Sequence, residues 1–149
     1  MKYTIPFTTR WADFDPNLHM RHSAYNDYAA EVRLRYFKAK GITINVLAKE
    51  HIGPVLFEEH TSFRKEIHLG ENITGTIQLV GLSKNGERWK LRHNLYNEAG
   101  DLAAEIQVYG AWIDTEKRKL TTPPDSFQLL FTDLEKTSDF EEIVLKKKK

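Results

Sequence analysis

A polar segment near the N-terminus gathers most of the side chains that could carry out chemistry. Between a predicted strand and a predicted helix stand Arg10, Asp13, Asp15, Asn17, His19, Arg21 and His22. A carboxylate held there could attack an activated carbonyl such as a thioester, or activate a water molecule. A helix N-terminus offers unpaired backbone amides and the positive end of a dipole, which stabilise an oxyanion. Because a thiolate leaves readily, this chemistry needs no strong acid for the leaving group.

The same residues also have a purely structural interpretation. Asp15-Pro16-Asn17 is a natural turn, because Asp favours the first position of a turn and Pro the second. His22 could simply cap the helix that follows. The residue types alone therefore leave both a catalytic loop and an ordinary turn open.

The elements around this segment can be predicted from periodicity. Residues 3–13 alternate with period two, which predicts a strand, and Asp13 to His22 reads as a loop. Ser23 is the predicted N-cap of one long helix, which ends before Gly41. A short second helix is expected over 42–51. The long helix would bury apolar residues at helical spacing, namely Tyr25, Tyr28, Ala29, Val32 and Tyr36.

From Gly53 the pattern changes to strands. Four alternating segments follow up to Trp112, and Asn85-Gly86 is a strong hairpin signal because both residues tolerate positive φ. We expect four antiparallel strands in a meander packed against one long helix. This is an α+β layout, with an antiparallel sheet around a central helix.

Pro123-Pro124 marks the expected end of the domain, which gives a domain over 1–124 and a C-terminal extension over 125–149. Apolar residues from Phe127 to Leu134 could form a short docking helix. The closing Lys146 to Lys149 is expected to be a solvated tail.

Composition excludes several classes of protein. The chain has 149 residues, a formal charge of +1 and no cysteine. It therefore has room for one domain, no global field for nucleic acid or a membrane surface, and no disulfide, thiolate zinc site or cysteine nucleophile. No signal peptide and no transmembrane segment is recognised, so the expected location is cytoplasmic, with neither nucleic acid nor membrane as partner.

The string RWADFDPNLHMRHSAYNDYAAEVR resembles the signature of the hotdog-fold acyl-CoA thioesterases, the 4-hydroxybenzoyl-CoA thioesterase group. Asp13 and Asp15 fill its paired aspartates, and Tyr25 its helix-opening tyrosine. The segments PVLFEEHTSFRKEIHLGENI and LAAEIQVYGAWIDTEKRKLTTPP look like later strands of the family in the right order. The resemblance covers roughly residues 3–124.

The resemblance implies roles for individual residues. Asp15 matches the catalytic aspartate, as nucleophile or general base, and His22 matches a position that assists chemistry or orients the thioester. Backbone amides near His22 and Ser23 would bind the thioester oxygen. Leu18 departs from a glycine of the family. Relatives form dimers or dimers of dimers with active sites at the subunit interface, so a homodimer or homotetramer is expected.

Other polar residues have supporting interpretations. Asp13 is expected to pair with Arg10 or hold the loop. His19, Asn17 and Tyr25 are expected to orient the site. Alternation should send either Glu58 or Glu59 inward, so Glu59 is a candidate beside the site. Candidates for binding CoA phosphates are Arg64, Lys65 and Arg88. No metal is predicted, since His60, His68 and His93 show no ligand spacing, and no cofactor is expected.

The sequence leaves three candidate functions for this chain. The first is hydrolysis of an acyl-CoA to free acid and CoA. The second is hydrolysis of an acyl group from an acidic carrier protein, and the third is binding of acyl ligands without catalysis. A hydratase on the same scaffold is a weaker fourth, because Glu31 alone does not supply the acid and histidine it needs. The acyl group is not determined by the sequence.

Overall fold

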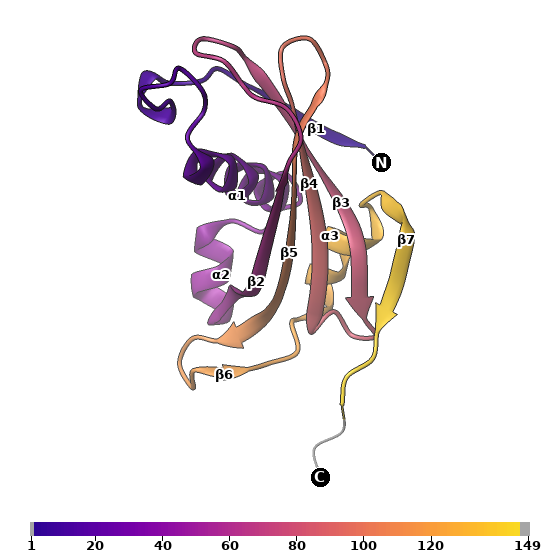
Figure 1. Cartoon of the computed structure of the whole chain (residues 1–149). Helices are drawn as coiled ribbons and strands as arrows, with labels where there is room; N and C mark the ends of the chain where they lie inside the picture. The colour runs from indigo at the N-terminus through magenta and orange to yellow at the C-terminus, as the bar shows by residue number, and fades with distance from the viewer. Residues whose placement is uncertain (1, 147–149) are drawn as a thin grey trace.

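A curled β-sheet forms the frame of the molecule in the computed structural model, which describes residues 2–146 (Figure 1). Its main path runs in the order β1-β3-β4-β5-β2, with β6 added to β5 and β7 added to β3. The strands are β1 (Tyr3–Phe7), β2 (Ile52–Phe63), β3 (Ile73–Ser83), β4 (Arg88–Tyr96), β5 (Leu102–Asp114), β6 (Lys119–Leu120) and β7 (Lys136–Ile143).

The predicted meander is correct for β3, β4 and β5 and wrong for β2. Strand β2 pairs antiparallel with β5, for example Ile52 with Asp114 and Phe63 with Ala104. Residues 64–72 then lead the chain to β3, two strands away from β5 in the sheet. Alternation along a strand predicts which side chains face the core, but it does not say which neighbour the strand pairs with.

Two helices lie on one side of the sheet (Figure 1). Helix α1 (His22–Ala39) buries the face predicted from its spacing, including Tyr25, Val32 and Tyr36. Gly41 follows with φ +84°, the left-handed conformation that commonly ends a helix. Helix α2 (Ile44–Glu50) is the predicted short second helix, with the Thr43 side chain accepting from the amide of Val46. The expected α+β class, an antiparallel sheet with helical cover, is confirmed.

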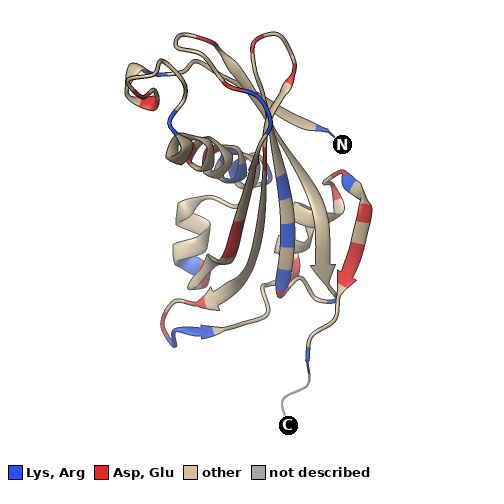
Figure 2. Cartoon of the chain, viewed as in Figure 1, with Lys and Arg blue, Asp and Glu red and all other residues tan. Residues whose placement is uncertain are grey.

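Strand β4 alternates as predicted. Trp89, Leu91, His93 and Leu95 are buried under the helices. Arg88, Lys90 and Arg92 face the other way, and Figure 2 shows this row of cations along β4. The hairpin between β3 and β4 contains Gly86 at φ +76°, as the Asn-Gly pair predicted.

The segment after Pro124 continues into the same core. It forms a 3₁₀ turn (Asp125–Gln128), helix α3 (Leu129–Thr132) and strand β7, which runs parallel to β3. The Tyr36 hydroxyl donates to the carbonyl of Leu130 at 2.6 Å. The expected docking helix is therefore present, and the strand after it was not predicted. The buried apolar side chains of the segment after Pro124 are Phe127, Leu130, Phe131 and Leu134.

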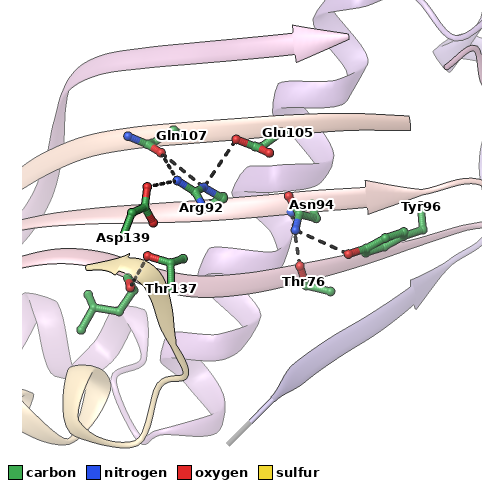
Figure 3. Close-up of polar contacts among 9 residues, drawn as sticks. Thr76, Arg92, Asn94, Tyr96, Glu105, Gln107, Thr137 and Asp139 are labelled. Carbon is green, nitrogen blue, oxygen red and sulfur yellow. Dashed lines mark hydrogen bonds and ion pairs between the residues drawn. The ribbon is translucent and has the colours of Figure 1, made fainter. Parts of the chain in front are cut away.

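A polar cluster on the outer face ties β7 to the sheet (Figure 3). The Arg92 guanidinium on β4 donates to Asp139 on β7 at 2.9 Å and to Gln107 on β5 at 3.1 Å. The Thr137 hydroxyl donates to the carbonyl of Leu79 on β3 at 3.4 Å. Of the predicted lysine tail, residues 147–149 lie outside the described part of the chain.

The first predicted strand is shorter than expected. Strand β1 ends at Phe7, and Trp11–Asp13 form a 3₁₀ turn instead. The Asp13 carboxylate causes this change, because it accepts from the backbone amide of Arg10 at 2.8 Å and so closes the turn on itself. Over residues 2–146, no helix is both long and apolar enough to cross a membrane.

Candidate active site

Asp15 sits at the base of a small hairpin. Phe14 and Met20 form a bridge across it, and the amide of Asp15 donates to the carbonyl of His19 at 2.9 Å. The amide of Leu18 closes the turn by donating to the carbonyl of Asp15 at 3.0 Å. Leu18 itself has φ 66°, a left-handed conformation that glycine adopts without strain. This explains in physical terms why glycine would suit the position.

A second segment holds this hairpin in place. The amide of Met20 donates to the carbonyl of Ile67 at 2.8 Å, and the amide of Leu69 donates to the carbonyl of Leu18 at 2.9 Å. The arm of the hairpin that follows the turn is thus paired to the connection between β2 and β3. A carboxylate on such a scaffold keeps a fixed position, as catalysis requires.

One Asp15 oxygen supports the loop and the other is free. Oδ1 accepts from the amide of Asn17 at 2.9 Å and from the amide of His19 at 3.3 Å. Among the residues that the structure describes, Oδ2 has no hydrogen-bond partner. Asp15 is half-buried. The turn interpretation and the catalytic interpretation are therefore compatible, because different oxygens of one carboxylate serve them.

The start of α1 differs from the predicted cap by two residues. Arg21 is the N-cap, with φ −63° and ψ 142°, and its amide donates to the carbonyl of Asp13 at 2.8 Å. Ser23 lies inside the first turn, where its hydroxyl accepts from the Arg21 guanidinium at 2.5 Å. Within residues 2–146 the backbone amides of His22 and Ser23 have no acceptor. They are free to bind an anionic oxygen.

A cavity of about 400 Å³ opens between this helix start and the end of β2. The ring of Tyr25 meets the ring of Phe63 edge-on at 5.1 Å and forms an apolar wall. Burial raises the pKa of the Tyr25 hydroxyl, which is therefore neutral near pH 7. The lining residues are Asp15, His19, Met20, His22, Tyr25, Phe63, Arg64, Lys65 and Glu66.

Asp13 has a supporting position. It is buried, and its carboxylate accepts from the Arg10 guanidinium at 2.9 Å and from the Tyr28 hydroxyl. Burial alone would raise the pKa of Asp13, but the hydrogen bonds from Tyr28 and Arg10 hold it below its ordinary value. The ionised carboxylate anchors the loop ahead of Asp15 and does not line the cavity.

Two predicted site residues lie elsewhere. Arg88 does not line the cavity: its guanidinium donates to the Tyr109 hydroxyl at 3.0 Å and lies 5.0 Å from the Phe57 ring centroid. Glu59 is exposed on β2, and so is Glu58. Alternation does send Glu59 toward the side of the sheet that α1 covers, since it lies opposite the buried Val108 and its charge acts on Arg33 of α1. It stands at the exposed edge of the sheet and does not line the cavity.

Other site residues were not predicted. Phe63 and Glu66 lie at and just beyond the end of β2, and Met20 ends the hairpin, all of them on the cavity wall. Their positions depend on the bridge between residues 18–20 and 67–69, which joins segments far apart in the sequence. No local pattern of residue types marks such a bridge.

Comparisons with known proteins identify a family for the chain. A sequence model of the thioesterase-like superfamily matches residues 9–131, a range that includes the Asp15 hairpin and α1. No curated protein matches the chain.

Several solved structures share the fold. A hypothetical protein from Staphylococcus aureus, solved in complex with CoA, is 24% identical with a TM-score of 0.83, over 92% of this chain and 87% of that one. A 1,4-dihydroxy-2-naphthoyl-CoA thioesterase from Synechocystis is 16% identical with a TM-score of 0.79, over 90% of this chain and 98% of that one. A thioesterase from Thermus thermophilus, solved with coenzyme A and zinc, is 22% identical with a TM-score of 0.72, over 89% of this chain and 93% of that one.

The family match extends over most of the chain, and the similar structures share its curled sheet and helical cover. The hotdog fold and the expected enzyme class, a thioesterase, are confirmed. This chain belongs to the thioesterase-like superfamily.

Proposed function

We propose that the protein hydrolyses an acyl-CoA to a free acid and CoA, with the Asp15 carboxylate as the catalytic group. The observation that carries the proposal is that a carboxylate with one free oxygen and a helix start with free amides lie at the same cavity. Asp15 and His22 both line this cavity, and the unpartnered amides of His22 and Ser23 begin the helix beside it.

The chemistry follows from these groups. Asp15 either attacks the thioester carbon or takes a proton from a water molecule that attacks it. The carbonyl oxygen becomes negative in either route, and the free amides of α1 stabilise that charge. The C–S bond then breaks, and CoA leaves with its sulfur protonated by solvent or by the proton that Asp15 took from water. If Asp15 attacks directly, water then hydrolyses the resulting anhydride, so water supplies the hydroxyl of the acid product in both routes. His22 orients the thioester beside these amides.

Recognition of CoA is assigned to the cavity rim. Arg64 and Lys65 line the cavity and are exposed, so they can meet CoA phosphates through charge-assisted hydrogen bonds. Lys65 pairs with Asp101 at 3.2 Å and would exchange this partner for phosphate. The complexes of similar proteins with CoA support a CoA thioester as the substrate class.

We further infer that two copies of the chain assemble through β2. This strand pairs with β5 on one side only, so its other edge carries unpaired backbone groups. Leu56, Phe57 and Phe63 are exposed along it. A second copy would cover both the edge and these side chains, and the assembly is either a homodimer or a homotetramer built from it.

A panel of thioesters tests the function. Thiol release is measured with short, medium, long and aromatic acyl-CoAs, and in parallel with the same acyl groups on an acyl carrier protein. Turnover of at least one acyl-CoA with a higher kcat/KM than its carrier-protein counterpart supports the proposal. Preference for the carrier protein would assign the enzyme to carrier substrates, and binding of acyl-CoA without thiol release would make it a ligand-binding member of the family.

A further inference from the structure

A second group of side chains includes two that line the Asp15 cavity, and the proposed hydrolysis does not use their side chains. His19, Glu66 and His68 each offer a ligand atom, and these atoms lie within 4.8 Å of one another. His19 Nε2 is 3.1 Å from Glu66 Oε2, and His68 Nε2 is 3.6 Å from the same oxygen. From these contacts, the geometry points to a binding site for a borderline divalent metal ion such as Zn²⁺.

The distances suit tetrahedral coordination. Ligand atoms placed about 2.0–2.2 Å from a tetrahedral zinc ion lie roughly 3.3–3.6 Å from one another. Of the two separations from Glu66, 3.6 Å falls at the upper end of this range and 3.1 Å slightly below it. Two imidazoles and one carboxylate favour zinc and its neighbours over magnesium or calcium, which prefer all-oxygen sites.

Glu71 prepares His68 for this role. Its Oε2 lies 3.3 Å from His68 Nδ1 and accepts from the His68 backbone amide at 2.6 Å. A proton on Nδ1, donated to Glu71, leaves Nε2 with a free lone pair directed toward Glu66. Histidines that bind metals commonly have such a carboxylate behind them, which fixes the tautomer and the ring orientation.

A metal ion at this site would stabilise the position of the Asp15 hairpin. His19 and His68 face each other across an isolated bridge, and their ring centroids are 5.4 Å apart. The backbone of His19 also contacts Asp15, through the bonds described above. A metal ion on these ligands therefore cross-links the Asp15 hairpin to residues 66–71. The side chains are partly or well exposed, so an ion can reach them from solvent.

The prediction of no metal was based on spacing along the chain, where His68 has no neighbouring histidine at ligand distance. The bridge between residues 19 and 68 supplies the missing ligand in space. The three side chains could alternatively form only a surface ion-pair cluster of protonated histidines around Glu66. The two cases differ in whether Zn²⁺ binds with one-to-one stoichiometry.

The test is calorimetric titration of chelator-treated full-length protein with Zn²⁺ alone. We expect one Zn²⁺ per chain for the wild type, at least tenfold weaker binding for His68→Asn and Glu66→Gln, and a Zn²⁺-dependent rise in Tm that both variants lose. His51→Asn is the matched control, because His51 pairs with a single carboxylate, Glu116, at 3.4 Å. It should bind Zn²⁺ like the wild type.

Asp15→Asn separates this inference from the proposed function. Asp15 is not among the ligands, so this variant should bind Zn²⁺ like the wild type whatever its activity. Absence of stoichiometric binding to the wild type would overturn the metal site, and so would equal losses in His68→Asn and His51→Asn. Neither result would bear on whether Asp15 is catalytic.

Discussion

At the scale of single residues, the surroundings of a side chain give different roles to residues of the same type. Asp13 is buried and bonds Arg10 and Tyr28, whereas Asp15 lines the cavity and keeps one oxygen free. His22 is exposed at the cavity, and His93 is fully buried. The sequence predicted that Asp13 would be a support and that Asp15 and His22 would lie together. It could not predict the Glu66 contact with His19, because this depends on a long-range bridge.

The burial of His93 predicts that the folded protein becomes less stable in acid. It lies between the Arg33 guanidinium, which donates to Nε2 at 3.0 Å, and the carbonyl of Thr76, 3.1 Å from Nδ1. Burial, with the charge of Arg33 adding to it, lowers the pKa of His93 from 6.5 to about 3. Between these two pH values the unfolded chain binds a proton that the folded chain does not, so the free energy of unfolding decreases as the pH falls from about 6.5 to about 3.

Urea denaturation of wild type and His93→Gln at several pH values checks this. The variant should be less stable at pH 7, because it disturbs a buried hydrogen-bonded pair, but its stability should depend less on pH over that window. His60→Gln, a change at an exposed histidine of β2, should keep the wild-type pH dependence. Parallel pH profiles for wild type and His93→Gln would contradict the buried neutral imidazole.

At the scale of elements, patterns within one segment were reliable and patterns between segments were not. The spacing of Tyr25, Val32 and Tyr36 predicted the buried face of α1, and alternation predicted the two faces of β4. The pairing of β2 with β5 and the strand β7 were missed. Exposed positions of β7 carry charged residues, and Figure 2 shows the acidic ones along it, so the strand lacks the apolar alternation of the central strands.

The segment after Pro124 should contribute strongly to stability. Phe127 is fully buried and meets the Trp112 ring edge-on at 5.2 Å. Phe127→Ala should lower the free energy of unfolding by about 3–5 kcal/mol, because it removes a large buried side chain and leaves a cavity. Leu129→Ala in the adjoining helix is the control, since Leu129 is 59% exposed, and its effect should be within about 0.5 kcal/mol. Chemical denaturation measures both, and equal effects would mean that this segment is not part of the cooperative core.

At the scale of the whole molecule, the free edge of β2 is the feature that most needs a partner. Light scattering coupled to size exclusion should give two or four times the mass of the chain. Leu56→Lys places a charge on the exposed edge and should raise the dissociation constant at least tenfold. Leu129→Lys, outside β2, should leave the assembly unchanged. A monomeric wild type, or equal effects of the two lysines, would contradict assembly through this strand.

The central claim is that the Asp15 carboxylate catalyses thioester hydrolysis, and Asp15→Asn tests it most directly. The amide oxygen of Asn can still accept from the amides of Asn17 and His19, so the hairpin should persist while the charge is lost. With the best acyl-CoA substrate, kcat should fall at least about 100-fold, with Tm near that of the wild type. Asp27→Asn, which removes an exposed carboxylate of helix α1, should keep wild-type activity. Wild-type turnover in a correctly folded Asp15→Asn protein would contradict the assignment.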